Sequence, residues 1–254
     1  MNVEYDEVLR QVQQDILEGG AGEGYARAYR AAERNYWIHV PGWIASLPRG
    51  IRVIDIGCAY GTLSLFTKRL LDAKVTCVDA ISAYSPQRLF AAEGVPFLLR
   101  NIELDDFSDL GQFDLVIITE VLEHLNFHPR ETLKKIRSLL CPDGRLILTT
   151  PDSSEWGVVT KYYSSLSEMP DPIPGRDWED AHIWQYSESE LRSVLEEAGF
   201  RIAELAYSPG NKSRHFNVLC TRKWILEAPG LLLALGHQPI ASRVEDRDKP
   251  EVSV

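Results

Sequence analysis

A short apolar run that ends in a glycine turn and continues as a helix constrains the fold of this chain more than any other feature. The run is Arg52–Ile56, the turn is Gly57-Cys58-Ala59-Tyr60-Gly61, and the amphipathic stretch Thr62–Leu71 follows. Glycine lets the backbone approach a ligand closely, and a helix N-terminus offers unpaired N–H groups. This order of elements therefore marks a candidate site for a nucleotide-like ligand.

The alternation of strand and helix continues through residues 50–150. Apolar runs predict further strands at 74–79, 97–100, 113–119 and 145–150. The run 113–119 is apolar almost throughout, as a central parallel strand buried on both faces should be. Alternation at this spacing predicts an α/β domain built on a parallel sheet with right-handed crossovers.

The regions on either side do not alternate strand and helix, so we divide the chain into three segments. Residues 1–48 are predicted as an N-terminal helical segment, and residues 49–222 as the ligand-binding domain. Within that domain, the proline-rich stretch 151–186 carries six aromatic residues, and a loop this long is usually functional. We predict that it forms a cap over the acceptor, and that residues 223–254 form a partly disordered C-terminal segment. The aromatic residues of the cap are Trp156, Tyr162, Tyr163, Trp178, Trp184 and Tyr186.

Charge and cysteine content narrow the function. The chain has 27 Lys and Arg against 37 Asp and Glu, a net charge of −10, which disfavours a broad nucleic-acid surface. Its four cysteines form no CxxC pair, so a zinc site or a disulfide framework is not expected. The N-terminus has no signal-peptide pattern, and no apolar run reaches the roughly 18 residues that span a bilayer. The expected location is the cytoplasm.

The acidic residue Asp79 narrows the choice of ligand. It ends the next predicted strand, about 20 residues after Gly57, where an acid can accept hydrogen bonds from ribose hydroxyls. A helix-capping role explains Asp79 alone equally well. In a dinucleotide dehydrogenase the turn would be Gly-x-Gly-x-x-Gly and would hold a pyrophosphate. Here Asp55 stands two residues before Gly57, and a carboxylate suits an amine and a sulfonium better than a pyrophosphate.

These motifs resemble those of the class I S-adenosylmethionine-dependent methyltransferases, in their small-molecule branch. The resemblance includes the glycine turn 55–61, Asp79 and the fourth-strand segment 113–125. It also includes the segment 142–151, which contains the turn into the fifth strand. It covers roughly residues 50–222, although Ala59 stands where many members have glycine. It implies a Rossmann-like, doubly wound, mostly parallel seven-stranded sheet with helices on both faces. An N-terminal helical extension and a cap inserted after the fifth strand complete the expected fold.

The resemblance also implies which residues bind S-adenosylmethionine. Asp79 would hold the ribose, and Glu120 would lie under the methionyl end, facing the acceptor. Tyr36 or Trp37 would close over the cofactor from the N-terminal segment. The other implied positions run from the methionyl part to the adenine: Asp55, Gly57, Cys58, Ala59, Gly61, Ala80, Ile81, Asn101 and Ile102.

The acceptor chemistry rests on carboxylates and imidazoles. Glu120, Glu123 and His124 are spaced to share one face if that stretch is helical, and His182 follows later. Such groups could bind a divalent metal or act directly as acid and base. The Glu-x-x-Glu-His pattern resembles the metal motif of small-RNA 2′-O-methyltransferases and of ubiquinone-pathway O-methyltransferases, but it also occurs where no metal is implied. We favour direct catalysis by His124, Glu120 and His182 over a metal site, with a structural role as the third alternative. His128 precedes Pro129 and is interpreted as a helix cap or surface residue.

The predicted function is methyl transfer from S-adenosylmethionine to a small organic acceptor. The nucleophile is expected to be an oxygen on a sugar, an aromatic or a natural-product scaffold. Two alternatives remain: a metal-dependent nucleic-acid 2′-O-methyltransferase and a non-catalytic S-adenosylmethionine-binding protein. The expected partner is the small-molecule acceptor, without nucleic acid or membrane, and a homodimer remains open.

Overall fold

The computed structural model describes residues 3–19, 24–156, 162–210 and 214–223. Within them, one seven-stranded sheet has the order β3-β2-β1-β4-β5-β7-β6. Strands β1 to β5 are parallel, and β7 runs antiparallel between β5 and β6. The strands are β1 (Arg52–Ile56), β2 (Lys74–Asp79), β3 (Phe97–Leu99), β4 (Phe113–Thr119), β5 (Leu140–Pro151), β6 (Phe200–Tyr207) and β7 (His215–Arg222). The expected Rossmann-like, mostly parallel sheet is confirmed.

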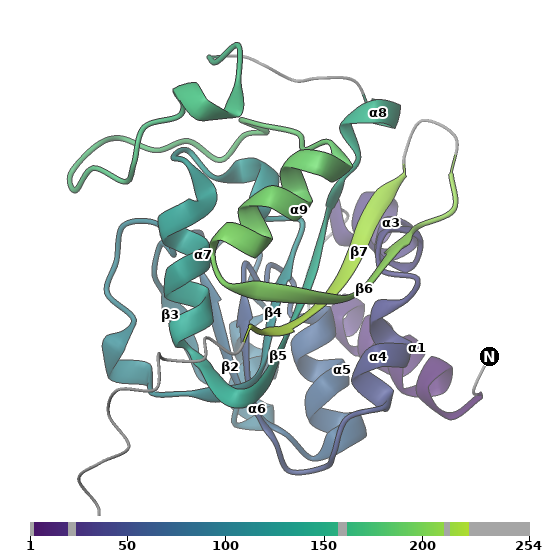
Figure 1. Cartoon of the computed structure of the whole chain (residues 1–254). Helices are drawn as coiled ribbons and strands as arrows, with labels where there is room; N and C mark the ends of the chain where they lie inside the picture. The colour runs from purple at the N-terminus through teal and green to yellow at the C-terminus, as the bar shows by residue number, and fades with distance from the viewer. Residues whose placement is uncertain (1–2, 20–23, 157–161, 211–213, 224–254) are drawn as a thin grey trace, which may run out of the picture. The chain divides into compact units, whose positions relative to one another are not determined.

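Helices cover both faces of the sheet, as predicted. Helices α7 and α9 lie on one face, and α1, α4 and α5 lie on the other (Figure 1). The α-helices are α1 (Val3–Glu18), α3 (Arg30–Tyr36), α4 (Val40–Ala45), α5 (Thr62–Leu71), α6 (Gln87–Glu93), α7 (Pro129–Ser138), α8 (Ser153–Trp156) and α9 (Glu188–Glu197). The short elements are a π-helix, η1 (Tyr25–Tyr29), and the 3-10 turns η2 (Ser108–Leu110), η3 (Leu122–His124) and η4 (Leu166–Glu168).

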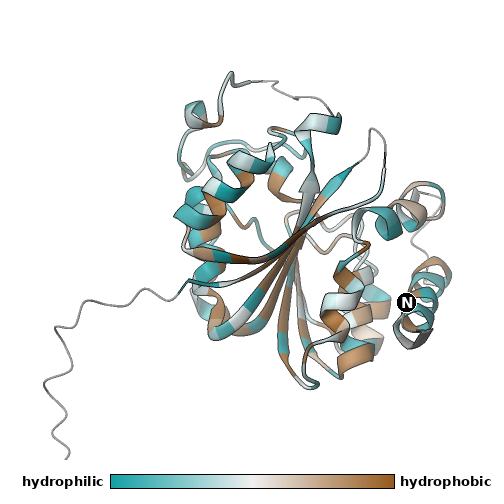
Figure 2. Ribbon diagram, turned by 45° about the vertical axis from the view of Figure 1, so that its right-hand side comes forward, coloured by the Kyte–Doolittle hydropathy of each residue, from teal (hydrophilic) through white to brown (hydrophobic). Residues whose placement is uncertain are grey.

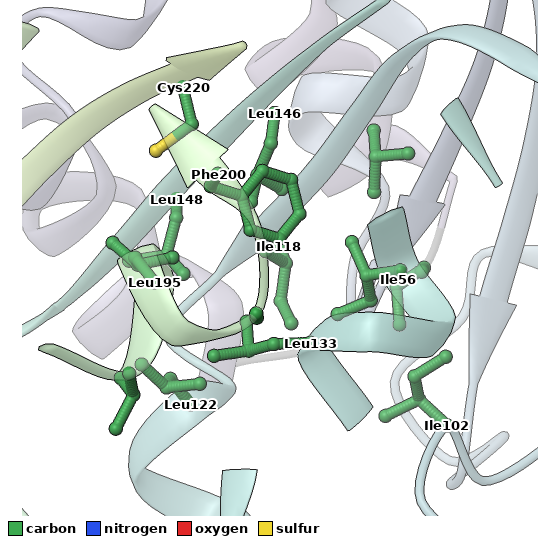
Figure 3. Close-up of a cluster of buried hydrophobic side chains, with 14 of the residues drawn as sticks. Ile56, Ile102, Ile118, Leu122, Leu133, Leu146, Leu148, Leu195, Phe200 and Cys220 are labelled. Atoms are coloured by element: carbon green, nitrogen blue, oxygen red, sulfur yellow. The ribbon is translucent and has the colours of Figure 1, made fainter. Parts of the chain in front are cut away.

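The apolar strands separate two cores. Successive side chains of a strand point to opposite faces, so Val116 and Ile118 of β4 pack with α7 and α9, while Leu115 and Ile117 pack with α1, α4 and α5. Apolar residues are accordingly concentrated on the strands and on the inner sides of the helices in Figure 2. Figure 3 shows the first core, where Leu133 of α7 and the strand residues converge. Burial on both faces holds the strand ends in place, and those ends carry the site.

Two helices begin at a side-chain cap. Ser187 accepts the backbone N–H of Glu190, whose carboxylate reaches back to the backbone N–H of Ser187. His128 caps α7, because its Nδ1 accepts the backbone N–H of Arg130 at 3.3 Å, ahead of Pro129. The capping role proposed for His128 is therefore confirmed, although its side chain is buried.

The structure corrects two sequence expectations. The segment from Glu120 to His124 is not one helix, because Glu120 has a φ of +54° and only the 3-10 turn η3 follows. Glu120 therefore does not share a helix face with Glu123 and His124. Strand β5 begins at Leu140, earlier than expected, and continues through residues 142–144 with a shift of register against β4. The expected turn is a bulge in this strand, because Leu140 pairs with Phe113 and Arg145 with Leu115, and residues 141–144 have no partner on β4.

Several predictions concern segments that the structure describes only partly. The described residues up to Lys223 belong to one compact unit, and the boundary between 1–48 and 49–222 stays a prediction. The C-terminal segment 223–254, apart from Lys223, lies outside the described residues, as do 157–161 of the predicted cap. Within the described part of the chain, no helix combines the length and apolar composition needed to cross a membrane.

Candidate functional site

A cavity of about 530 Å³ lies where β1, β2 and β4 end. The chain leaves β1 toward β2 on one side, whereas β4 and β5 lie on the other, so this is the point where the strand order reverses. In open α/β sheets, ligands bind at this switch point, outside the carboxyl ends of the strands. The cavity is also of the size that small ligands and cofactors occupy.

Nearly all the predicted site residues line this one cavity. Gly61 is the exception among the predicted cofactor and catalytic positions, and Tyr36 and Trp37 also face the cavity. The predicted residues on the wall are Asp55, Gly57, Cys58, Ala59, Asp79, Ala80, Ile81, Asn101, Ile102, Glu120, His124 and His182. The sequence motifs therefore converge in space, which supports a single site.

The two glycines of the turn are required for different reasons. Gly57 has a φ of +76°, and a Cβ there would lie 2.1 Å from Cγ2 of Val121. Gly61 caps α5 with a φ of +71°, and a Cβ there would lie 2.3 Å from the ring of Phe90. Gly57 thus lets the turn approach the loop after β4, whereas Gly61 packs α5 against α6. Ala59, which also has a positive φ of 43°, keeps its backbone N–H directed at Asp79.

We expect Gly57→Ala to destabilise the protein by about 1–3 kcal/mol, because an L-residue at positive φ is strained and Val121 must shift. The Val121→Ala background removes the clash and leaves the strain. In a double-mutant cycle read by urea unfolding, Gly57→Ala should therefore cost less in that background than in the wild type. Equal costs in both backgrounds would show that the close approach to Val121 has no energetic consequence.

Asp79 is held rigidly at the end of β2. Its Oδ2 accepts the backbone N–H of Ala59 at 2.9 Å, and its Oδ1 accepts that of Ile81 at 2.9 Å. Burial raises the pKa of Asp79, and these backbone hydrogen bonds oppose that rise. Each carboxylate oxygen can accept a further hydrogen bond. The arrangement suits a ligand with two neighbouring hydroxyl groups.

Asp55 lies beneath the glycine turn and is 2% exposed. Its Oδ2 accepts the hydroxyl of Ser64, which in turn accepts the thiol of Cys77 at 3.0 Å. Burial is the main cause that raises the pKa of Asp55 to about 7, and the charge of Asp79 adds to it. A cation bound in the cavity would favour the ionised carboxylate again.

This pKa predicts how the stability of the ligand-free protein depends on pH. Because the pKa of Asp55 is about 7 in the folded chain against a usual 3.8, the folded state retains a proton that the unfolded state releases. Its contribution therefore lowers the free energy of unfolding as pH rises from about 4 to about 7. Asp55→Asn cannot ionise, so urea unfolding should show a shallower decline across this window. Buried Glu33 and Glu103, whose pKa values are also about 7, keep their slope in both proteins.

The exposed Asp143→Asn variant is the matched control for this measurement. It should reproduce the wild-type slope, because the substitution removes an exposed carboxylate and leaves Asp55 in place. Parallel curves for the wild type and Asp55→Asn would contradict the buried, protonated state assigned to Asp55.

The N-terminal helices close one side of the cavity. Glu33 of α3 is 5% exposed and accepts hydrogen bonds from Gln13, Tyr25 and Thr62, the last at 2.8 Å. Thr62 is the first residue of α5, so this buried network fastens the N-terminal segment next to the glycine turn. Desolvation by burial raises the pKa of Glu33 to about 7.

Two glutamates meet at the other end of the cavity. Oε1 of Glu120 accepts the hydroxyl of Thr149 at 2.7 Å, and Oε2 lies 2.9 Å from Nε2 of His215. Glu123 is 1% exposed, and its Oε2 accepts the hydroxyl of Thr150 at 2.9 Å. Burial raises the pKa of Glu123 well above its usual range, and the charge of Glu120 adds to the effect. Oε1 of Glu123 is buried without a hydrogen-bond partner among the described residues, as expected of a group that meets a ligand.

His124 lies beside these carboxylates with a partner of its own. Its Nδ1 lies 2.9 Å from Oδ1 of Asp180, and its ring packs edge-on against His182 with centroids 4.8 Å apart. Burial lowers the pKa of His182, and His124 lowers it further, which favours a neutral imidazole. Nδ1 makes no hydrogen bond among the described residues, so the proximity of Asp180 alone makes this pair resemble the carboxylate–imidazole arrangement of a general base.

The same residues offer a second chemistry. Ligand atoms of Glu123, His124 and His182 lie within 4.8 Å of one another, so they could hold a metal ion. Glu120 is not in this set, since Thr149 and His215 engage its carboxylate. The pattern Glu-x-x-Glu-His therefore supplies two candidate ligands, Glu123 and His124, rather than three.

Sequence reasoning missed two residues that line the cavity, and the predicted cap contributes fewer aromatic side chains to it than expected. Asp180 and His215 reach the cavity from the cap and from β7, and no spacing motif connects them to Glu120 or His124. Of the cap aromatics with described side chains, only Trp178 lines the cavity, together with Asp180 and His182. Trp184 and Tyr186 instead pack in the core with α9. A search for buried polar residues near the ends of strands could have found His215.

Comparisons with known proteins agree with this geometry. Residues 29–205 match the model of the methyltransferase domain family. A ubiquinone biosynthesis O-methyltransferase of Xanthomonas axonopodis pv. citri is 36% identical over 107 residues, which are 41% of this chain and 44% of that protein. A ubiquinone biosynthesis O-methyltransferase of Cereibacter sphaeroides is 37% identical over 110 residues, 42% of this chain and 44% of that protein. The matched regions thus span less than half the length of these curated relatives.

The solved structures extend the likeness over most of the fold. The 1,6-didemethyltoxoflavin-N1-methyltransferase of Burkholderia thailandensis superposes with a TM-score of 0.56 at 21% identity, over 88% of this chain and 91% of that one. The magnesium protoporphyrin IX methyltransferase of Synechocystis superposes with a TM-score of 0.53 at 21% identity, over 80% of this chain and 85% of that one. This chain therefore belongs to the methyltransferase domain family and has the class I fold of S-adenosylmethionine-dependent methyltransferases.

Proposed function

We propose that this protein binds S-adenosylmethionine in the cavity and transfers its methyl group to an oxygen of a small organic acceptor. The observation that carries the proposal is the placement of Asp79 and the His124–Asp180 pair on the wall of one cavity. Asp79 suits a ribose, and His124 suits the proton of an acceptor hydroxyl. The structural neighbour from Burkholderia thailandensis was crystallised with S-adenosylhomocysteine, which agrees with the cofactor.

The residues present fit this cofactor. Asp55 and Asp79 provide carboxylates for its amine and its ribose. Trp37 also lines the cavity, and its buried Nε1 has no hydrogen-bond partner among the described residues. When bound, S-adenosylmethionine supplies a methyl group on a positively charged sulfur. Residues of α3 and Trp178 line the cavity and would limit the access of water to that point. Much of the acceleration then comes from holding the two reacting groups in line.

His124 would remove the proton that an acceptor hydroxyl loses. Nδ1 lies 2.9 Å from Oδ1 of Asp180, which leaves Nε2 to take that proton. The deprotonated oxygen would then be the nucleophile for the methyl group that bound S-adenosylmethionine supplies, and the sulfur would keep the electron pair of the broken carbon–sulfur bond. The carboxylate of Glu120 and the buried carboxyl group of Glu123 line the same cavity as His124. The curated relatives are named as ubiquinone biosynthesis O-methyltransferases, which favours an oxygen nucleophile on an aromatic ring.

A metal-dependent nucleic-acid methyltransferase is the second candidate, because Glu123, His124 and His182 could hold a metal. Charge opposes it. Arg100 is the only lysine or arginine among the described residues that line the cavity, and its guanidinium is bound by Asp109 at 2.6 Å. A phosphate backbone requires several such cations. We therefore favour the small-molecule acceptor.

Two measurements test the proposal. Calorimetry with S-adenosylmethionine and S-adenosylhomocysteine should show binding of both to the purified protein. Turnover is then measured as release of S-adenosylhomocysteine, with catechols, monophenols, sugars, amines and a short RNA as acceptors. We expect methylation of a phenolic or sugar oxygen. Transfer to RNA alone would support the second candidate, and binding without transfer to any acceptor would favour a non-catalytic protein.

A further inference from the structure

His215 occupies an unusual place for a histidine. It is the first residue of β7, is 1% exposed, and lies on the cavity wall. Its Nε2 lies 2.9 Å from Oε2 of Glu120. The other oxygen of Glu120 accepts the hydroxyl of Thr149 at 2.7 Å. The two oxygens of this carboxylate therefore have one partner on β5 and one on β7, and the sheet determines the orientation of the carboxylate.

The backbone at Glu120 adds to this constraint. Glu120 has a φ of +54°, a conformation that costs free energy for a residue with a Cβ. Its backbone N–H donates to the carbonyl of Thr149 at 3.0 Å. The strained turn places the side chain over the end of β5, within reach of both Thr149 and His215. Surrounding contacts thus hold Glu120 in one position at the edge of the cavity.

His215 also contacts the N-terminal segment. The ring of Tyr36, the last residue of α3, stacks on the imidazole with centroids 3.9 Å apart and an angle of 29°. Asn217 lies on the same face of β7, donates to the carbonyl of Tyr36 at 2.7 Å and accepts the N–H of His39 at 3.3 Å. Strand β7 and α3 lie side by side in Figure 1. One strand therefore fastens both a carboxylate at the base of the cavity and an aromatic ring on its wall.

We infer that His215 is a positioning residue for methyl transfer. It orients the Glu120 carboxylate toward the positively charged centre that donates the methyl group, and it seats Tyr36 over the same point. This inference rests on the proposed function, because it assumes that the cavity binds S-adenosylmethionine with its methionyl end near Glu120. His215 has no place in the proton transfer assigned to His124. Its role is electrostatic, since an oriented charge stabilises a cation more than a mobile one.

The test compares two ligands that differ in charge at one position. Sinefungin carries an ammonium group where S-adenosylmethionine carries its sulfonium methyl, whereas S-adenosylhomocysteine is uncharged there. We define the ratio as the dissociation constant of S-adenosylhomocysteine divided by that of sinefungin, both measured by calorimetry. A high ratio means that the protein favours a cation at the methyl position. No acceptor is needed for this measurement. Glu120→Gln should abolish the preference and gives the value expected without the charge.

Two variants of His215 separate positioning from other roles. His215→Gln keeps an N–H donor near the place of Nε2, whereas His215→Phe keeps a ring for Tyr36 and removes the donor. We expect His215→Phe to reduce the preference for sinefungin about tenfold, a typical coupling between contacting groups, and His215→Gln to retain most of it. A merely structural role would weaken both ligands equally and leave the ratio unchanged. An unchanged ratio would therefore overturn the inference. A higher ratio in both variants would also overturn it, because it would show that His215 neutralises the charge of Glu120 in the wild type.

Tyr36 provides a second test if His215→Phe does not fold, because Tyr36 is only partly buried. Tyr36→Phe keeps the stacked ring and should preserve the ratio, whereas Tyr36→Ala should lower it. An unchanged ratio in Tyr36→Ala would contradict the seating of Tyr36 by His215. Absence of binding of both ligands to the wild type would instead overturn the proposed function, and this inference with it. The two failures are therefore distinguishable.

Discussion

Asp79→Ala should weaken the binding of S-adenosylhomocysteine about 10- to 150-fold. The carboxylate would accept hydrogen bonds from the ribose hydroxyls, and hydrogen bonds to a charged group contribute about 1.5–3 kcal/mol. Asp79 is already oriented by the backbone N–H groups of Ala59 and Ile81, so little entropy is lost when the ligand binds. Calorimetry gives the affinity directly, because this ligand is not turned over.

The substitution also frees two backbone N–H groups, so its effect on folding must be separated from its effect on binding. Asp79→Asn keeps an acceptor oxygen and approximately the same volume, and we expect it to lose less affinity than Asp79→Ala. Thermal unfolding of all three proteins without ligand reports damage to the turn. Unchanged affinity in Asp79→Ala would remove the ribose assignment. The exposed Asp143→Ala variant controls for the loss of one negative charge.

His124→Ala should reduce turnover on the best acceptor about 10²- to 10⁴-fold, the usual contribution of a general base. Binding of S-adenosylhomocysteine should change little, since the proposed role concerns the acceptor. Asp180→Asn should have a smaller effect in the same direction, because the amide can still contact Nδ1 but no longer stabilises an imidazolium. Initial rates and dissociation constants, measured on the same preparations, separate the two effects.

Chelation distinguishes the base from a metal ligand at the same position. If His124 acts as a base, EDTA should leave the rate unchanged, and His182→Ala should cost less than His124→Ala. If Glu123, His124 and His182 hold a metal, EDTA should abolish activity, a divalent ion should restore it, and both histidine variants should be equally impaired. We expect the first pattern. Full activity of His124→Ala would contradict both and leave the histidine a structural residue.

Local sequence features predicted the architecture and the cofactor edge. Five parallel strands follow the apolar runs, because strands buried on both faces require continuous apolar sequence. Gly57 and Asp79 could be placed at one edge, since the carboxyl ends of neighbouring parallel strands meet there. Capping at His128 and Ser187 was also predictable, because a cap depends on residues within one turn. These features depend on contacts between residues that are close in the sequence or on periodic burial.

The acceptor end required the tertiary structure. The positive φ of Glu120 occurs at a residue that is not glycine, so the sequence contains no sign of it. It excludes the helix on which a shared face of Glu120, Glu123 and His124 depended. His215 reaches Glu120 only because β7 pairs antiparallel with β5, placing His215 opposite Pro151, and a shift of one residue would turn its side chain to the other face. Asp180 meets His124 through the path of the cap. The sequence by itself thus determined which strand ends carry the cofactor residues, whereas long-range pairing and the loop path decided which partners orient the groups facing the acceptor.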